Sequence, residues 1–411
     1  MPRKNISCRD CGSPDLVRFL DLSDQPPANA FIRPEQVDTE HFYPLQAYVC
    51  AECQLVQLGD IVDLNELFQN YVYLTAAIPT TPTHFREYAA QVVAKHLSGK
   101  NGLIVELGSN DGLLLSAFQE SGCANVLGID PAKNVAERAN ARGVPTLAAP
   151  WSEALAVSIR KQNGLAAVII GNNVVAHIDD HHDFVRGVKV LLAPDGVLIF
   201  EAPYLVDMFE NLSYDTIYHE HLSCLSLRPL KRLFESFGLE VFDMKVKNVQ
   251  GVSMRVFVGW SGAHRVSKRV LEFVNKEEGM NLNLVESYRN LARRVEKRKD
   301  ELVALLADLK RQGKRIAGYG APAKGNTMLN YAKIGPDILE YLTEELPTKI
   351  GLLSPGMHIP VVSVDAARAN PPDYFLLLAW NYAEAVLKKE APLRREGVKF
   401  IIPVGGYLRV A

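Results

Sequence analysis

The stretch Leu103–Gly112, LIVELGSNDG, reads as a strand, a tight loop and the start of a helix. Its first five residues form an apolar run, which is typical of a strand in a parallel sheet that helices cover on both faces. Gly108 lets the backbone approach a ligand closely, and Gly112 eases the turn into the helix. Asn110 and Asp111 are suitable N-terminal caps for that helix.

Further apolar runs surround this stretch at 125–129 (NVLGI), 166–170 (AAVII) and 196–200 (GVLIF). Segments with helical periodicity lie between them, which predicts repeated βαβ units. The region from about Thr80 to about Arg255 is therefore expected to be an α/β domain with a Rossmann-like, doubly wound sheet.

The loop after the first strand predicts a bound cofactor. Asp130 ends the next strand, where an acid can accept hydrogen bonds from both ribose hydroxyls of an adenosine group. The loop lacks the G-x-G-x-x-G pattern that holds pyrophosphate. Its acids, Glu106 and Asp111, would repel pyrophosphate but suit a cationic sulfonium, so S-adenosylmethionine is favoured over NAD. The candidate cofactor residues are Glu106, Leu107, Gly108, Ser109, Asn110, Asp111, Asp130 and Asn172.

Two cysteine pairs, Cys8-x-x-Cys11 and Cys50-x-x-Cys53, lie near the N-terminus. Each C-x-x-C knuckle places two thiolates on one turn, and two knuckles complete a tetrahedron around Zn²⁺. Four cysteines leave no open coordination position, so the predicted zinc is structural, and its binding energy stabilises a module with little core. A redox pair or free thiols are the alternatives.

Bulk composition excludes several function classes. The 411 residues carry 45 basic and 47 acidic side chains, a formal net charge of −2, which argues against nucleic acid as a partner. No run approaches the roughly 18 apolar residues of a membrane span, and the first residues lack a signal-peptide core. We therefore expect a cytoplasmic protein with no membrane partner. Its oligomeric state is open, and a monomer is compatible with the sequence.

Four zones follow from these patterns. The predicted division is a zinc-binding domain at 1–75, the cofactor-binding domain at 76–260, a helical linker at 261–312 and a second, smaller Rossmann-like domain at 313–411. The linker shows apolar residues at helical spacing among many charges, as one long or two shorter helices would.

The segment Tyr214–His221, YDTIYHEH, concentrates titratable side chains after the 196–200 strand. His221 or Tyr218 could act as a base if a methyl group goes to carbon or oxygen, with Glu220 orienting the histidine. His-Glu-His is not the H-E-x-x-H motif of zinc hydrolases. By residue type alone, the segment could also be a polar surface loop, and His177 could be a capping or core histidine.

Taken together, these motifs resemble one known family over essentially the whole chain: the sugar C-methyltransferases that act on nucleotide-linked 4-keto-deoxysugars, such as the C-3′-methyltransferases of antibiotic deoxysugar pathways. The motifs that carry the resemblance are the two knuckles, Phe68–Tyr73, ELGSNDG, Asn173–His177, Ile217–His221, Gln250–Arg255, Gly318–Thr327 and Ser354–Gly356. The chain departs from the family pattern at Gln250–Ser253, where His-Gly-Gly-Ser is usual, which leaves the sugar and the methylated position open.

The resemblance implies a site and a reaction. A 4-keto group acidifies the C-3 proton, a base removes it, and the enolate attacks the methyl group. The implied catalytic residues are Tyr218, Glu220, His221, His177 and one tyrosine of the 71–73 stretch, for which Tyr73 is preferred. The implied substrate-binding residues are Tyr71, Ser253, Arg255, Gly320, Lys324 and Asn326.

A second glycine loop, Gly318-x-Gly320-x-x-Ala323, follows a predicted strand and opens a helix. We expect Lys324, Asn326 and the helix N-terminus to hold the diphosphate of the nucleotide-sugar. A turn with no ligand is the alternative. Three other functions stay open: methylation of an oxygen or of a non-sugar acceptor, an NAD-dependent oxidoreductase that uses this loop, and a zinc-knuckle binding protein with a degenerate enzyme fold.

Overall fold

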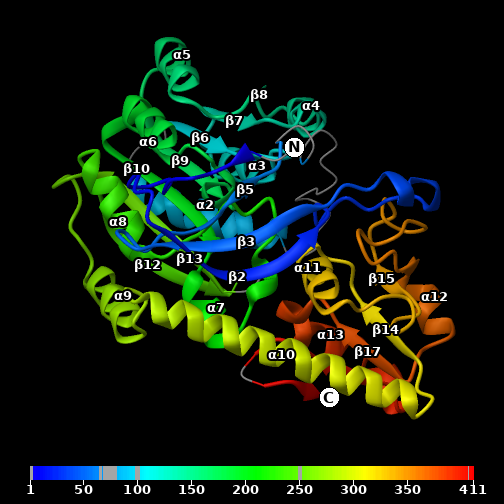
Figure 1. The fold of residues 1–411 in the computed structure, drawn as a ribbon. Helices are drawn as coiled ribbons and strands as arrows, with labels where there is room; N and C mark the ends of the chain where they lie inside the picture. The colour runs from blue at the N-terminus through cyan, green and yellow to red at the C-terminus, as the bar shows by residue number, and fades with distance from the viewer. Residues whose placement is uncertain (1–2, 64–66, 68–80, 98–101, 249–251, 406) are drawn as a thin grey trace.

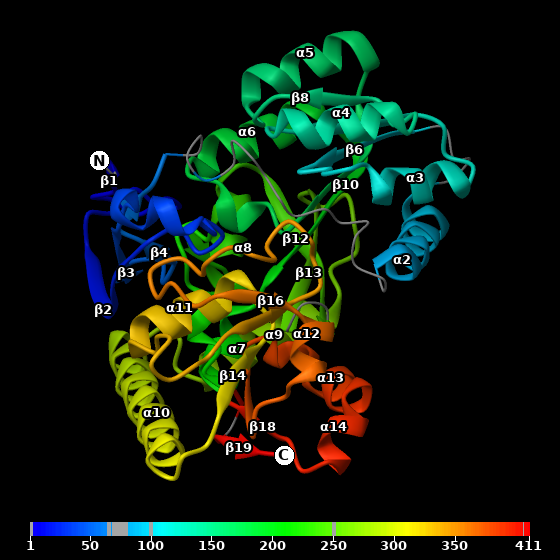
Figure 2. The ribbon, with the colours of Figure 1, turned by 90° about the vertical axis from the view of Figure 1, so that its right-hand side faces the viewer.

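A computed structural model describes residues 3–63, 67, 81–97, 102–248, 252–405 and 407–411. The strands of these residues form sheets of two, four, six and seven strands (Figure 1). The seven-stranded sheet is central, the four-stranded sheet lies beside it, and the six-stranded sheet forms a separate C-terminal layer (Figure 2). The predicted α/β class with its three structural parts is confirmed.

The central sheet has the order β12-β13-β10-β9-β6-β7-β8. Five neighbouring strands are parallel, and β13 runs antiparallel to both β10 and β12. The predicted apolar runs lie in β6, β7, β9 and β10, because strands covered on both faces are mostly apolar. Their buried acids Glu106 and Glu201 stand near the carboxyl ends of β6 and β10. The bounds are β6 Leu103–Leu107, β7 Val126–Asp130, β8 Thr146–Ala148, β9 Ala166–Asn172, β10 Leu192–Pro203, β12 Leu239–Asn248 and β13 Val252–Trp260.

Helices cover both faces of this sheet. One face packs on α2 (Thr81–His96), α3 (Leu113–Glu120) and α4 (Lys133–Ala141). The other packs on α5 (Glu153–Asn163), α6 (His181–Leu191), α7 (Leu205–Asn211) and α8 (Leu227–Ser236). Apolar side chains of α8 recur at the spacing of one helical face, which buries that face on the sheet.

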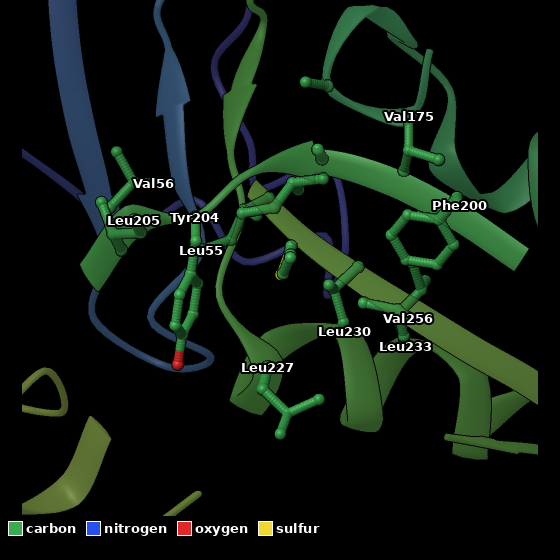
Figure 3. Packing of buried hydrophobic residues seen from close by; sticks show 14 of the residues in the cluster. Leu55, Val56, Val175, Phe200, Tyr204, Leu205, Leu227, Leu230, Leu233 and Val256 are labelled. Carbon is green, nitrogen blue, oxygen red and sulfur yellow. The ribbon is translucent and has the colours of Figure 1, made fainter. Parts of the chain in front are cut away.

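The four-stranded sheet has the order β11-β4-β3-β2 and shares a core with the central sheet. Leu55 and Val56 lie beside Leu205 and Tyr204 of the segment that follows β10 (Figure 3). Moreover, β11 belongs to the chain before α8 and pairs with β4. The bounds are β2 Leu16–Gln25, β3 Tyr43–Cys50, β4 Val56–Leu58 and β11 Ser223–Cys224, with η1 (Pro34–Thr39) between β2 and β3 and a small sheet of β1 (Arg3–Lys4) and β5 (Asp60–Ile61) nearby.

Two helices occupy the predicted helical segment: α9 (Lys268–Gly279) and the long α10 (Val285–Arg311). Near its start, α10 packs on β2, where the Tyr288 and Phe19 ring centroids lie 5.2 Å apart. Its later apolar residues, Leu302, Leu306 and Leu309, belong to the core of the C-terminal sheet. Figure 1 shows the helix extending from α9 to the C-terminal module. Among the described residues, no helix combines the length and the apolar character of a membrane span.

The C-terminal sheet has the order β16-β15-β14-β17-β18-β19, parallel except for β19. Its helices α11 to α14 lie around it (Figure 2). The bounds are β14 Ile316–Tyr319, α11 Ala323–Ala332, β15 Leu342–Glu344, β16 Val361–Ser363, α12 Val364–Ala369, β17 Tyr374–Leu377, η5 Trp380–Tyr382, α13 Ala383–Lys389, α14 Ala391–Arg395, β18 Lys399–Ile402 and β19 Arg409–Val410.

A buried carboxylate joins α9 to the central sheet. Glu277 accepts hydrogen bonds from the backbone N–H groups of Leu227 (2.7 Å) and Arg228 (3.1 Å) at the start of α8. It also accepts one from the Tyr204 hydroxyl (2.8 Å). These donors would otherwise be buried without partners, so the single carboxylate satisfies a helix start and a core tyrosine together.

We predict that Glu277→Ala destabilises the protein by about 2–4 kcal/mol, because two buried donors and one part-buried donor lose their acceptor. Its exposed neighbour Glu278, whose ion pair with Arg228 is 3.7 Å long, provides the matched control. Glu278→Ala should cost about 0–0.5 kcal/mol. Chemical denaturation followed by fluorescence measures both, and equal midpoints for the two variants would contradict the role of Glu277.

Candidate functional site

Four cysteines gather from the turn that precedes β2 and the turn that follows β3. The Sγ atoms of Cys8, Cys11, Cys50 and Cys53 lie within 4.8 Å of one another. The Cys8–Cys53 and Cys11–Cys50 pairs are 3.4 and 3.6 Å apart. Zn–S bonds of about 2.3 Å in a tetrahedron place the sulfur atoms about 3.8 Å apart. The four thiolates therefore fit a structural zinc ion with a closed shell of ligands.

Hydrogen bonds connect the first knuckle, Cys8–Cys11, to the start of α6 and the residues just before it. The Asp10 carboxylate lies 2.5 Å from His181 Nδ1, and both side chains are buried. His182 Nε2 meets the Asp10 carbonyl at 2.6 Å, and Arg9 donates to the Asp179 carboxylate at 3.2 Å. Because His177 stands four residues before His181, the zinc module fixes the segment that carries this candidate histidine.

The predicted cofactor residues meet at the carboxyl edge of the parallel strands. Asp130 accepts hydrogen bonds from the backbone N–H groups of Asn110 and Ala132, both at 2.9 Å. This carboxylate therefore ties the loop after β6 to the loop after β7. Asn172 ends β9 at the same edge, because β9, β6 and β7 are parallel neighbours. Such an edge is where doubly wound sheets bind ligands.

One local expectation for this loop was wrong. Gly112, not Asn110 or Asp111, occupies the N-cap position of α3 with φ +77°, and the Asn110 side chain instead accepts from the Asp111 N–H. Gly108 is required for a second reason besides ligand approach. It has φ +63°, and a Cβ atom there would lie 2.4 Å from Val174 Cγ2.

Several polar atoms at this edge have no hydrogen-bond partner within the described part of the chain. They are Glu106 Oε2, Ser109 Oγ and Asn172 Nδ2. Burial, followed by the neighbouring Asp130 and Asp111, raises the pKa of Glu106 well above its ordinary value. Asp111 pairs with Arg142 at 3.0 Å. Orphaned buried polar atoms fit a polar ligand such as S-adenosylmethionine, whose sulfonium would favour the ionised form of Glu106.

The predicted substrate residue Arg255 lies in a buried polar cluster beneath α2. Its guanidinium pairs with Glu201 at 2.6 Å and stacks 3.6 Å from the centre of the Tyr88 ring. The Tyr88 hydroxyl reaches Asn172 Oδ1 at 3.4 Å. Ser253, also buried, stands two residues earlier on β13. The charge of Arg255 is thus compensated within the chain, and its contacts join α2 to the cofactor edge.

The catalytic candidates form a compact group after η4 (Tyr214–Thr216). His221 Nδ1 meets the Thr216 carbonyl at 2.7 Å, and His221 Nε2 meets the Tyr218 hydroxyl at 3.0 Å. A carbonyl only accepts, so Nδ1 carries the proton and Nε2 is the free base. The expected orientation of His221 by Glu220 was therefore wrong, because Thr216 fills that role.

Burial controls the charge of this group. It lowers the pKa of His221 to about 4, so the ring is neutral at pH 7. His177 packs edge-on against it, with ring centroids 4.9 Å apart, and burial followed by the His221 charge lowers the pKa of His177 well below its ordinary value. The alternative of a polar surface loop was wrong, since Glu220 and His221 are only 4% and 9% exposed.

Glu220 faces the other two parts of the molecule. Its carboxylate accepts a hydrogen bond of 2.7 Å from Asn29 of the N-terminal module. Burial raises the pKa of Glu220 to about 7, opposed by Asn29 and by the charge of Lys349. Lys349 comes from the C-terminal module, where it pairs with Glu344 at 3.4 Å and donates to the Ala321 carbonyl at 2.9 Å.

The second glycine loop adjoins the same group. Lys324 lies over the Trp380 ring at 4.0 Å, and Trp380 Nε1 donates to Asp215 at 2.6 Å. Burial raises the pKa of Asp215 to about 6 and lowers that of Lys324 to about 8. Gly320 N–H donates to the Thr343 hydroxyl at 2.9 Å, and Asn326 donates to the Ala28 carbonyl at 2.8 Å.

The structure thus brings Tyr218, His221 and His177 together and sets Glu220 beside the N- and C-terminal modules. Tyr71 and Tyr73 lie outside the described residues. Four residues had no role assigned from the sequence: Asn29, which bonds Glu220, Lys349, whose charge acts on Glu220, and Asp215 and Trp380, which adjoin Lys324. Only Asp215 had a signal, since it stands within the polar Tyr214–His221 stretch.

Comparisons with known proteins identify the family. The chain is 36% identical to C-methyltransferase NovU of Streptomyces niveus over 399 residues, which cover 97% of this chain and 95% of NovU. This chain belongs to the C-methyltransferase family. Family profiles agree: "Putative zinc binding domain" matches 8–68, "Methyltransferase domain" matches 83–243 and "C-methyltransferase C-terminal domain" matches 248–405. The protein is an S-adenosylmethionine-dependent methyltransferase.

Solved structures with a likeness to the chain include magnesium protoporphyrin IX methyltransferase ChlM of Synechocystis PCC 6803 with bound S-adenosylmethionine. It is 11% identical, with 43% of this chain and 78% of that chain covered and a TM-score of 0.32. A methyltransferase of Anabaena variabilis is 12% identical, with 48% and 91% covered and a TM-score of 0.37.

We predict that the purified protein holds one zinc ion per chain and that chelation lowers its melting temperature, because metal-binding energy is folding energy for this module. Cys8→Ser should lose the metal and reproduce the effect. Cys224→Ser, which changes a cysteine outside the cluster, should keep it. Elemental analysis and thermal denaturation measure both properties, and a metal-free wild type with unchanged melting would contradict the assignment.

Proposed function

We propose that this enzyme transfers a methyl group to C-3 of a nucleotide-linked 4-keto-deoxysugar through an enolate. The Tyr218–His221 pair is the observation that carries the proposal, because it presents a neutral base on the same turn as the buried Glu220. C-methylation needs such a base, since carbon must lose a proton before it attacks a methyl group. Relationship to a C-methyltransferase supports the same chemistry.

The proton follows a short route. When S-adenosylmethionine is bound, it supplies the electrophilic methyl group. The C-3 proton passes to His221 Nε2, either directly or through the Tyr218 oxygen as its own hydroxyl proton moves to Nε2. Both routes end with an imidazolium whose Nδ1–H is held by the Thr216 carbonyl. Glu220, whose pKa of about 7 keeps part of it protonated, can donate a hydrogen bond to the enolate oxygen.

The C-terminal loop is the proposed site for the diphosphate. The ammonium group of Lys324 and the N-terminus of α11 offer positive charge and donors at one place. Asp215 and Trp380 adjoin Lys324 and connect this loop to η4, three residues before Tyr218. The nucleotide end of the substrate would thus bind next to η4, the 3-10 helix that directly precedes Tyr218 and His221.

A turnover screen of 4-keto nucleotide-sugars with labelled S-adenosylmethionine tests this function. We expect a labelled product whose methyl group NMR places at C-3. The ketone also acidifies the proton at C-5. A methyl group found at C-5 would therefore correct the proposed position of methylation but support the enolate mechanism. Labelling of an oxygen, or equal turnover of the matching 4-hydroxy sugar, would overturn the proposal.

We predict that His221→Ala and Tyr218→Phe lower turnover by about 10²–10⁴-fold, the usual contribution of a general base. Both should bind S-adenosylhomocysteine as the wild type does, because neither residue belongs to the predicted cofactor residues. Deuterium exchange at C-3 in the absence of methyl donor should fall in parallel. Tyr374→Phe on β17 is the remote control, and wild-type exchange in both active-site variants would refute the base assignment.

A further inference from the structure

The segment Pro26–Arg33, here called the strap, leaves β2 and lies between the Glu220 turn and the C-terminal module. The Ala28 carbonyl accepts a hydrogen bond from Asn326, and Ile32 forms an isolated β-bridge with Leu353. Phe31 lies 4.7 Å beneath the Lys349 ammonium group. The strap therefore contacts C-terminal residues on both sides of Asn29, which points its amide at Glu220.

The backbone of the strap is conformationally restricted around Asn29. Pro26 and Pro27 are buried and have fixed φ angles, which limits the conformations of the chain just before Asn29. Two turn hydrogen bonds follow, from the Ala30 N–H to the Pro27 carbonyl (2.9 Å) and from the Phe31 N–H to the Asn29 carbonyl (3.0 Å). The position of the Asn29 side chain is thus largely set before it meets Glu220.

Few groups face the Glu220 carboxyl group. Asn29 donates to it directly, at 2.7 Å. From the C-terminal module, Lys349 acts on it by charge, and that charge is shared with Glu344. On its own turn, His221 and Tyr218 bond each other, and His219 Nε2 lies 3.3 Å from the Tyr43 and Pro44 carbonyls. Among the described residues, Asn29 is the hydrogen-bond donor found on this carboxylate.

We propose that Asn29 is a positioning residue of the methyl-acceptor site, which holds the carboxyl group of Glu220 in place from the zinc-bearing module. The inference rests on the proposed function for its effect on turnover, but not for its effect on Glu220 itself. An amide donor stabilises a carboxylate relative to the neutral acid. Asn29 therefore controls both the orientation of Glu220 and the pH at which Glu220 loses its proton.

Substitution of Asn29 separates this role from simple packing. Asn29→Leu keeps the size of the side chain and removes the donor, so the pKa of Glu220 should rise from about 7 by roughly one further unit. Asn29→Asp places a second carboxyl group at hydrogen-bond distance, and the pair should then hold a proton to still higher pH. Both variants should lower kcat by about 10–100-fold and change KM for the sugar little.

Glu40→Gln is the matched control. Glu40 joins the N- and C-terminal modules through His358 (2.8 Å) and the Gly356 N–H (2.9 Å), and no contact with Glu220 is among its interactions. If Asn29 served only to fasten the modules together, this variant would behave like Asn29→Leu. We expect instead that it keeps the wild-type protonation midpoint of Glu220 and the wild-type kcat.

Infrared difference spectroscopy of the full-length protein provides the direct test. The carbonyl band of the protonated Glu220 is identified by its loss in Glu220→Gln, and its amplitude against pH gives the midpoint without any sugar present. A higher midpoint in Asn29→Leu, with no change in Glu40→Gln, supports the proposal. An unchanged midpoint in Asn29→Leu, or an equal shift in Glu40→Gln, overturns it. Failure of the sugar screen alone would instead overturn the proposed function.

Discussion

The apolar contact between the four-stranded N-terminal sheet and the central sheet underlies the rest of the molecule. A sheet of this size cannot bury enough apolar surface alone, so it relies on its metal knuckles and on this shared core. Leu55 and Val56 pack against Leu205, and each fully buried side chain of this kind contributes about 1.5–3 kcal/mol. Because this contact fixes the N-terminal module, Asp10 reaches His181 and Asn29 reaches Glu220.

Closure of the three modules has an electrostatic consequence. Burial is the largest cause of the pKa shift at each of four neighbouring groups, His221, Glu220, Asp215 and Lys324. It removes water that would otherwise stabilise the charged forms, so the histidine stays neutral and Glu220 keeps part of its proton near neutral pH. On an exposed loop the same residue types would have their ordinary pKa values, and a glutamic acid would then be ionised near neutral pH and unable to donate a hydrogen bond.

The features that the sequence predicts correctly are those that depend on neighbouring residues in the chain. Apolar runs predict β6, β7, β9 and β10 because a strand covered on both faces must be mostly apolar. The two C-x-x-C knuckles predict the metal cluster because each one places two thiolates on a single turn. Glu220 shows the limit, since its amide partner lies 191 positions away on the strap and no local pattern reports that contact. The cap of α3 was missed because the positive φ of Gly112 fills the N-cap position without a side-chain acceptor.

The cofactor edge and the proposed acceptor site are therefore built by different means. The cofactor edge consists of loops at the ends of adjacent parallel strands, held by short-range contacts such as those from Asp130 to Asn110 and Ala132. A parallel sheet with this strand order forms that edge independently of the N- and C-terminal modules. The proposed acceptor site depends on side chains from three modules: the Tyr218–His221 turn, Asn29 of the N-terminal module and Lys349 of the C-terminal module. These side chains come together only in the complete fold. Changes in acceptor choice between relatives should accordingly arise in the strap and the C-terminal loop, where a substitution can reshape one contact and leave the parallel sheet unchanged.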